Sequence, residues 1–234
     1  MKVCAVQYRP PKADPAAARN EIAAFAKEAC GHGAQIVVFP EMASAGYIWK
    51  GRDAILPHAE RADGELFQAL SPIAAEHSSW IVCGFPEIAD DSLFNSAIVI
   101  SPAGEIAACY RKVLLFDADM SWALPGDTRY LIGTDSGKIA PGICMDLNDD
   151  GFTSFARQHA SVIPFCTNWL EEGLDVHEYW RLRLEGFKGI LIAANSWGFD
   201  GVTEFCGRSA VFAQGMKCIA SAGREGNCLV FADV

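Results

Sequence analysis

A carboxylate, an ammonium group and a thiol each stand at the end of a predicted buried strand. Glu41 follows the strand 35–39, Lys112 follows the strand 105–111, and Cys144 stands at the end of a further strand. The carboxyl ends of strands form the ligand crevice of open α/β sheets, so these side chains can meet there. A thiol reacts as the thiolate, so a neighbouring base must take its proton, and a nearby cation can stabilise the thiolate and a later oxyanion. The positions therefore suggest a nucleophilic thiol site.

Further residues follow strands in the same way. Asn168 and Trp169 come after the strand 161–166, and Asn195 comes after the strand 190–194. Taken singly, each of these residues has an ordinary interpretation. A cysteine is usually a small buried hydrophobe, and a charged residue at a strand end is usually solvated.

The elements that must position these residues alternate between strands and helices. Asp14 and Pro15 predict a helix start, and Gly31 and Gly33 predict its end. The segment 102–104 predicts a hairpin turn between two strands. Strands are expected at 2–8, 35–39, 80–85, 94–100, 105–111, 161–166 and 190–194, and helices at about 64–77 (broken at Pro72), around 152–156 and over 176–188.

This alternation, together with the hairpins, indicates an α/β layered fold with a mixed sheet. No linker, charge block or internal repeat divides the sequence, so residues 1–234 are expected to form one domain.

Composition excludes several classes of protein. A chain that is 51% hydrophobic and 21% charged is not disordered. The 19 basic against 29 acidic residues give a net charge of −10, which argues against nucleic acid or an anionic membrane surface as a partner. No apolar run approaches the roughly 20 residues that a membrane span needs, and the N-terminal stretch is not typical of a signal peptide.

The nine cysteines lie mostly in apolar segments, and no two have a C-x-x-C spacing. This pattern predicts reduced, buried thiols in a cytoplasmic protein rather than a disulfide framework or a zinc site. We expect neither a metal nor a cofactor.

Three segments share their order and spacing with one protein family. VVFPEMASAGY at 37–47, YRKVLLF at 110–116 and PGICMD at 141–146 resemble the segments that carry the Glu-Lys-Cys triad of the carbon–nitrogen hydrolase (nitrilase-like) superfamily. Weaker resemblances at 94–104, 125–127, 167–169, 193–195 and 205–212 extend over nearly the whole chain.

The resemblance implies an αββα sandwich, with mixed sheets flanked by helices, that usually pairs through its helices. It also implies a cysteine-dependent amidase that forms a thioester and releases an acid and ammonia or an amine. Cys144 would be the nucleophile and Glu41 the base, while Lys112 and the backbone N–H of Met145 would hold the oxyanion. Asn168 and Trp169 would help to position the substrate.

The sequence departs from the family pattern after the lysine and after the cysteine. Asp119 stands seven residues after Lys112, where many amidases of the family carry a second glutamate, and we expect it to position the substrate amide. Because Asp is one methylene shorter than Glu, either the loop closes inward to compensate, or the pocket is wider and is lined by Met120 and Trp122. The alternative is that Asp119 is a solvated loop carboxylate. The segment 147–151 lacks the arginine of the omega-amidase-like branch. The segments ICMDLN at 143–148, PEMA at 40–43 and YWRLR at 179–183 instead resemble the branch that deamidates N-terminal Asn or Gln of proteins.

Alternative functions remain open. The chain could be a Cys–His hydrolase of another fold, an inactive member that serves as an interaction module, or a glutaminase subunit that feeds a synthetase. For the amidase we expect a small-molecule amide or a peptide N-terminus as substrate. We also expect a homodimer or higher homo-oligomer, because the resemblance implies pairing through helices, and Trp180 and Phe187, flanked by Tyr179, place large side chains on one face of the 176–188 helix. The alternative is that this face packs on the chain's own sheet.

Overall fold

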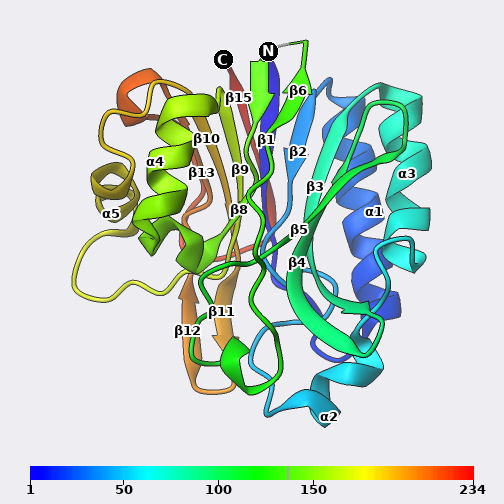
Figure 1. Ribbon diagram of the computed structural model, residues 1–234. Helices are drawn as coiled ribbons and strands as arrows, with labels where there is room; N and C mark the ends of the chain where they lie inside the picture. Colours follow the sequence, from blue (N-terminus) through cyan, green and yellow to red (C-terminus); the bar gives the residue numbers. More distant parts are fainter. Residues whose placement is uncertain (136) are drawn as a thin grey trace.

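The computed structural model describes residues 1–135 and 137–234. Within these residues the strands form two larger sheets that pack face to face, with helices covering the outer face of each sheet (Figure 1). The first sheet has the order β15-β1-β2-β3-β4-β5, and the second has the order β14-β13-β10-β9-β7-β6 with β8 paired to β9. Both sheets mix parallel and antiparallel pairs, which confirms the predicted αββα sandwich.

The strands of the first sheet are β1 (Lys2–Gln7), β2 (Ile36–Val38), β3 (Trp80–Ala89), β4 (Ser92–Ile100), β5 (Ile106–Arg111) and β15 (Cys228–Asp233). Those of the second are β6 (Ile132–Thr134), β7 (Gly137–Ile139), β8 (Gly142–Ile143), β9 (Val162–Thr167), β10 (Ile190–Asn195), β13 (Ala210–Ala213) and β14 (Lys217–Ser221). The strands β11 (Trp197–Asp200) and β12 (Thr203–Cys206) form a separate hairpin.

The helices α1 (Pro15–Gly31) and α3 (Glu65–His77) cover the first sheet. Helix α1 begins as predicted, because the Asp14 side chain accepts a hydrogen bond from Ala17 N at 3.0 Å and Pro15 fits the first turn. Helix α3 contains Pro72 without being broken there, so the predicted interruption is wrong. The short helix α2 (Arg52–Ile55) lies at the end of the sandwich that also carries the β11–β12 hairpin.

The helices α4 (Asp150–His159) and α5 (Val176–Arg183) cover the second sheet. Helix α5 is shorter than the predicted 176–188, and Phe187 lies beyond it, next to Gly186 with a φ of 81°. Trp180 and Phe187 are both buried in the chain's own core. The expectation that these two side chains form a free pairing face is therefore wrong, because they already pack against the second sheet.

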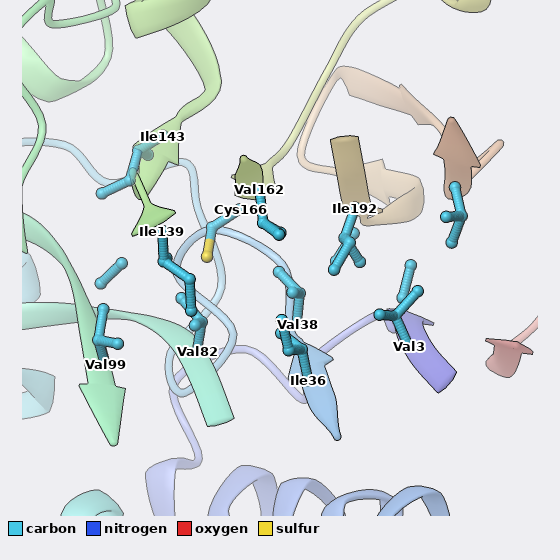
Figure 2. Close-up of a cluster of buried hydrophobic side chains, with 14 of the residues drawn as sticks. Val3, Ile36, Val38, Val82, Val99, Ile139, Ile143, Val162, Cys166 and Ile192 are labelled. Atoms are coloured by element: carbon cyan, nitrogen blue, oxygen red, sulfur yellow. The ribbon is translucent and has the colours of Figure 1, made fainter. Parts of the chain in front are cut away.

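The inner core lies between the two sheets. Val3, Val38 and Val82 of the first sheet point toward Val162 and Ile192 of the second (Figure 2). Because side chains alternate along a strand, the other face of each sheet is left for the helices. This packing holds the strand ends of both sheets in one rigid frame. No helix in the described parts of the chain is long and apolar enough to cross a membrane.

Candidate active site

Glu41 follows β2 in a turn that is tightly packed against β3. Gly84 lies so close to this turn that a Cβ atom on it would stand 2.5 Å from Pro40 O and 2.6 Å from Glu41 Cα. The next residue, Met42, is buried with a φ of 53°, a conformation that costs a non-glycine residue of the order of 1 kcal/mol. The close packing on Gly84 therefore fixes the Glu41 backbone, and the backbone strain lies at Met42.

The Glu41 carboxylate is buried, and both of its oxygen atoms accept hydrogen bonds. Its Oε1 atom accepts hydrogen bonds from Lys112 Nζ at 2.7 Å and from Asn95 Nδ2 at 2.7 Å. Its Oε2 atom accepts from the backbone N–H of Asn168 at 3.0 Å. The Asn168 side chain in turn donates to the Glu41 carbonyl at 2.8 Å. Residues from three other segments thus fix the orientation of one carboxylate.

Lys112 follows β5 and is also buried. Its carbonyl accepts from Gly126 N at 2.8 Å, so the loop after the lysine packs back on it. Its ammonium group pairs with Asp119 Oδ2 at 2.6 Å as well as with Glu41, and donates to Tyr47 Oη at 3.3 Å. One buried cation is therefore shared between two buried carboxylates.

Asp119 begins a short 3₁₀ turn, η2 (Asp119–Ser121), and is buried. Its carboxylate accepts from Asn95 Nδ2 at 3.1 Å and from Phe116 N at 3.1 Å, in addition to Lys112. The alternative of a solvated loop carboxylate is therefore wrong. The expected pocket lining is also wrong, because the Met120 side chain is 64% exposed and Trp122 packs in a cluster with Trp49.

Cys144 is the first residue of the 3₁₀ turn η3 (Cys144–Asn148), directly after β8. Its φ of 39° lies in the left-handed region, so the chain turns sharply at the thiol. Asp146, two residues on, is buried and accepts hydrogen bonds from Ile143 N, Val113 N, Leu114 N and Tyr110 Oη at 2.7–3.0 Å. This carboxylate ties the turn at Cys144 to the backbone that follows Lys112.

The buried charges shift one another's pKa values. Burial raises the pKa of Glu41, and the nearby Asp119 adds to this rise while Lys112 opposes it. Burial lowers the pKa of Lys112, but Glu41 and Asp119 outweigh it, so the net pKa is well above its ordinary range. Burial and Glu41 raise the pKa of the Cys144 thiol, and Lys112 opposes that rise. Glu41 is thus a strengthened base, and Lys112 stays charged.

A cavity of about 160 Å³ opens beside the thiol. Met145, Asn168 and Trp169 line it with Cys144, as do Tyr47, Phe116, Asn148, Leu170, Glu172, Leu174 and Tyr179. A larger cavity of about 530 Å³ shares Tyr47 and Asn168 but is lined mainly by the N-terminal loop and the β11–β12 hairpin, and Cys144 does not line it. The smaller cavity is therefore the candidate active site.

The structure thus places Glu41, Lys112 and Asp119 in one buried cluster, and Cys144, Met145, Asn168 and Trp169 on the adjoining cavity, whereas Met120 and Trp122 lie outside it. Asn168 holds Glu41, and Trp169, whose backbone N–H donates to Asn195 Oδ1 at 2.7 Å, forms part of the cavity wall. No histidine lines this cavity, so nothing in the described chain supports a Cys–His hydrolase. The described residues hold no cluster of His, Cys, Asp and Glu side chains that could bind a metal ion.

Sequence reasoning missed several residues that build the site. Asn95 bridges Glu41 and Asp119, and Asp146 clamps the cysteine turn, yet neither carried a signal of its own beyond its place in a motif. Gly84 could have been found, because a glycine inside a strand often marks a close backbone approach.

Comparisons with known proteins agree with this geometry. The family model described as carbon-nitrogen hydrolase matches residues 2–234. A nitrilase of Pyrococcus abyssi is 34% identical over 172 residues, which cover 72% of this chain and 65% of that protein. A protein N-terminal amidase of Saccharomyces cerevisiae is 32% identical over 154 residues, which cover 57% of this chain and 34% of that protein. The matched parts are less than two thirds of either relative.

Among solved structures, an amidase from Nesterenkonia sp. superposes with a TM-score of 0.88 over 100% of this chain and 90% of that one. The two sequences are 21% identical, so this is a likeness of fold.

Proposed function

Because the chain belongs to the carbon–nitrogen hydrolase family, we propose that it hydrolyses a carboxamide through a thioester on Cys144. The observation that carries the proposal is the buried pair of Glu41 and Lys112 at 2.7 Å, with the Cys144 thiol on the adjoining cavity. This arrangement combines a base, a cation and a nucleophile without solvent between the charged groups.

In the first step Glu41 takes the thiol proton, and the sulfur attacks the amide carbon. The C=O π electrons move onto oxygen, which becomes an oxyanion. Lys112 supplies positive charge to that oxygen, and the backbone N–H of Met145 donates a hydrogen bond to it. The raised pKa of Glu41 makes proton transfer from the thiol easier.

In the second step the tetrahedral intermediate collapses, and the C–N bond breaks. Glu41 returns its proton to the departing nitrogen, so ammonia or an amine leaves and a thioester remains. Water, deprotonated by Glu41, then attacks the thioester carbon. The C–S bond breaks, the sulfur regains a proton, and the acid is released.

The cavity favours a small acyl group without negative charge. Its walls are mainly aromatic and aliphatic, including Phe116, Trp169 and Leu170, and no Lys, Arg or His is among the residues that line it. An omega-amide carries a carboxylate that needs a cation to pair with, and the residues that line this cavity supply none. We therefore assign small, neutral, linear carboxamides as the first substrate class.

A second candidate substrate is an N-terminal Asn or Gln residue of a peptide. Glu172 is exposed and is the one carboxylate among the residues that line the cavity. It can pair with the α-ammonium group of such a substrate while the side-chain amide reaches Cys144. The similarity to a protein N-terminal amidase is in line with this candidate.

Ammonia release from short neutral amides and from peptides that begin with Asn or Gln tests the proposal. Cys144→Ala should abolish release and should show no acyl adduct in intact-protein mass spectrometry, whereas Cys228→Ala on β15 serves as the control and should keep both. Glu41→Gln should lose several orders of magnitude in rate, because an amide cannot accept the thiol proton. Near-normal turnover by Cys144→Ala would overturn the proposal.

The two substrate classes are separated by Glu172→Gln. This change should lower kcat/KM for the peptides, by roughly tenfold for a lost charge-assisted contact, and should leave neutral amides unaffected. An equal effect on both classes would remove the basis for assigning Glu172 to the ammonium group.

A further inference from the structure

Thr167, the last residue of β9, carries a hydroxyl group that has no evident structural role. The residue is fully buried, and within the described chain its Oγ1 atom has no hydrogen-bond partner. A buried hydroxyl without a partner destabilises the fold relative to one that is hydrogen-bonded to water. Valine would fill the same space in this strand without that cost, so the hydroxyl needs another explanation.

The sheet register places this hydroxyl near the proposed nucleophile. Strands β8 and β9 are parallel, with Gly142 opposite Phe165 and Ile143 opposite Cys166. Continuing that register by one residue sets Cys144 beside Thr167. The adjoining residue Asn168 lines the cavity with Cys144 and holds Glu41. Thr167 therefore adjoins both the proposed nucleophile, by extension of the register, and the residue that holds the base.

The electrostatics of the site also place the Thr167 hydroxyl near the Cys144 thiol. Burial and Glu41 raise the pKa of the Cys144 thiol. Lys112, the Thr167 hydroxyl and the backbone N–H of Asn168 each lower it. The ionisable groups around the sulfur are Glu41, Lys112 and Tyr47, and Lys112 is already shared between Glu41 and Asp119. A thiolate at this position thus needs a neutral donor of its own.

We propose that Thr167 is a positioning residue that donates its hydroxyl hydrogen to the Cys144 sulfur when the thiol loses its proton. This inference rests on the proposed role of Cys144 as the nucleophile. A neutral thiol is a weak acceptor, which explains why the hydroxyl is unpartnered in the resting site. A thiolate is a strong acceptor, so the hydrogen bond forms when the negative charge appears and holds the sulfur toward the cavity.

Two variants at this position isolate the hydroxyl. Thr167→Val keeps the branched shape and removes the donor, whereas Thr167→Ser keeps the donor and removes a methyl group. The measurement is the rate at which iodoacetamide alkylates Cys144 as a function of pH, followed by peptide mass spectrometry. Thr153→Val on α4, another buried threonine, is the matched control for placing valine in the core.

Thr167→Val should slow alkylation of Cys144 at neutral pH by roughly tenfold to a hundredfold, the range of hydrogen bonds to charged groups. The pH midpoint of the alkylation rate should rise by about one unit for each tenfold loss of rate at neutral pH. Thr167→Ser and Thr153→Val should stay within about twofold of the wild type. Should Thr167→Val fail to fold, as judged by circular dichroism, Thr167→Ala carries the same expectation.

The outcomes separate this inference from the proposed function. If Cys144 of the wild type reacts no faster than the other eight cysteines, the proposed function fails. If Cys144 is selectively reactive but the rate and midpoint are the same without the Thr167 hydroxyl, only the role of Thr167 is overturned. A rate lowered equally by Thr167→Val and Thr167→Ser would indicate a packing effect and would also overturn it.

Discussion

Lys112 and Asp119 form an ion pair of 2.6 Å in which neither side chain is exposed to solvent. The two residues are seven apart in sequence, and the intervening loop folds back so that Phe116 N also donates to the Asp119 carboxylate. Removing one partner of a buried charge pair leaves the other charge uncompensated. Here Lys112 would keep Glu41 as its charged partner and Tyr47 as a neutral one. The Glu41 carboxylate would also lose the Asn95 bridge that links it to Asp119.

Asp119→Asn and Asp119→Ala should therefore both lower kcat/KM on one substrate, by about a hundredfold or more. The reason is that a shift near 1 Å in the Lys112 ammonium group or the Glu41 carboxylate disturbs the reacting geometry. Asp117→Asn, which changes an exposed carboxylate of the same loop, is the control and should be neutral. Wild-type kinetics in both Asp119 variants would mean that this residue has no part in the reaction.

Gly84→Ala should damage both stability and activity. The added methyl group would lie 2.5–2.7 Å from three backbone atoms at Pro40, Glu41 and Met42, and backbone cannot move aside as a flexible side chain can. Overpacking of this kind costs about 1–3 kcal/mol, measurable as a lower midpoint in thermal or urea unfolding. Gly133→Ala in β6 meets no atom within 4 Å and should change little. Equal behaviour of the two variants would contradict the close approach.

The pH dependence of kcat/KM should have an acid limb above 4.5, the ordinary pKa of glutamic acid, because burial raises the pKa of Glu41. Activity needs the ionised carboxylate, so it falls as the pH drops through this raised pKa. Asp119 contributes to the rise, so Asp119→Asn should move the acid limb to lower pH in whatever activity remains. A rate profile on a substrate without ionisable groups measures this, and a limb at or below 4.5 in the wild type would refute it.

The homo-oligomer stays a prediction, although the face first assigned to it is buried. Helix α5 still presents Leu182, whose side chain is 61% exposed, on its outer surface. We expect light scattering at micromolar concentration to give twice the 25.3 kDa chain mass, and Leu182→Glu to lower that mass. Val202→Glu in the β11–β12 turn is the control. A mass of 25.3 kDa for the wild type would rule out the dimer.

The sequence alone was enough to locate the ends of the strands that carry Glu41, Lys112 and Cys144. Apolar runs that stop at a polar residue are local patterns, and the position of a strand end depends mostly on such local information. Asp119 was singled out in another way, because its seven-residue spacing from Lys112 resembles the position of the family's second glutamate.

Only the tertiary structure decided what each of these side chains contacts. The bond from Asn95 to Glu41 and the clamp of Asp146 on Val113 join residues more than 30 positions apart, through strand pairings that a one-dimensional pattern does not define. The apolar stripe with Trp180 was visible in the sequence, but a stripe looks the same whether it packs on its own sheet or on a partner. Thr167 is an ordinary strand residue in the sequence, and its proposed role depends on the β8–β9 pairing, which ends at Ile143 and Cys166, the residues just before Cys144 and Thr167.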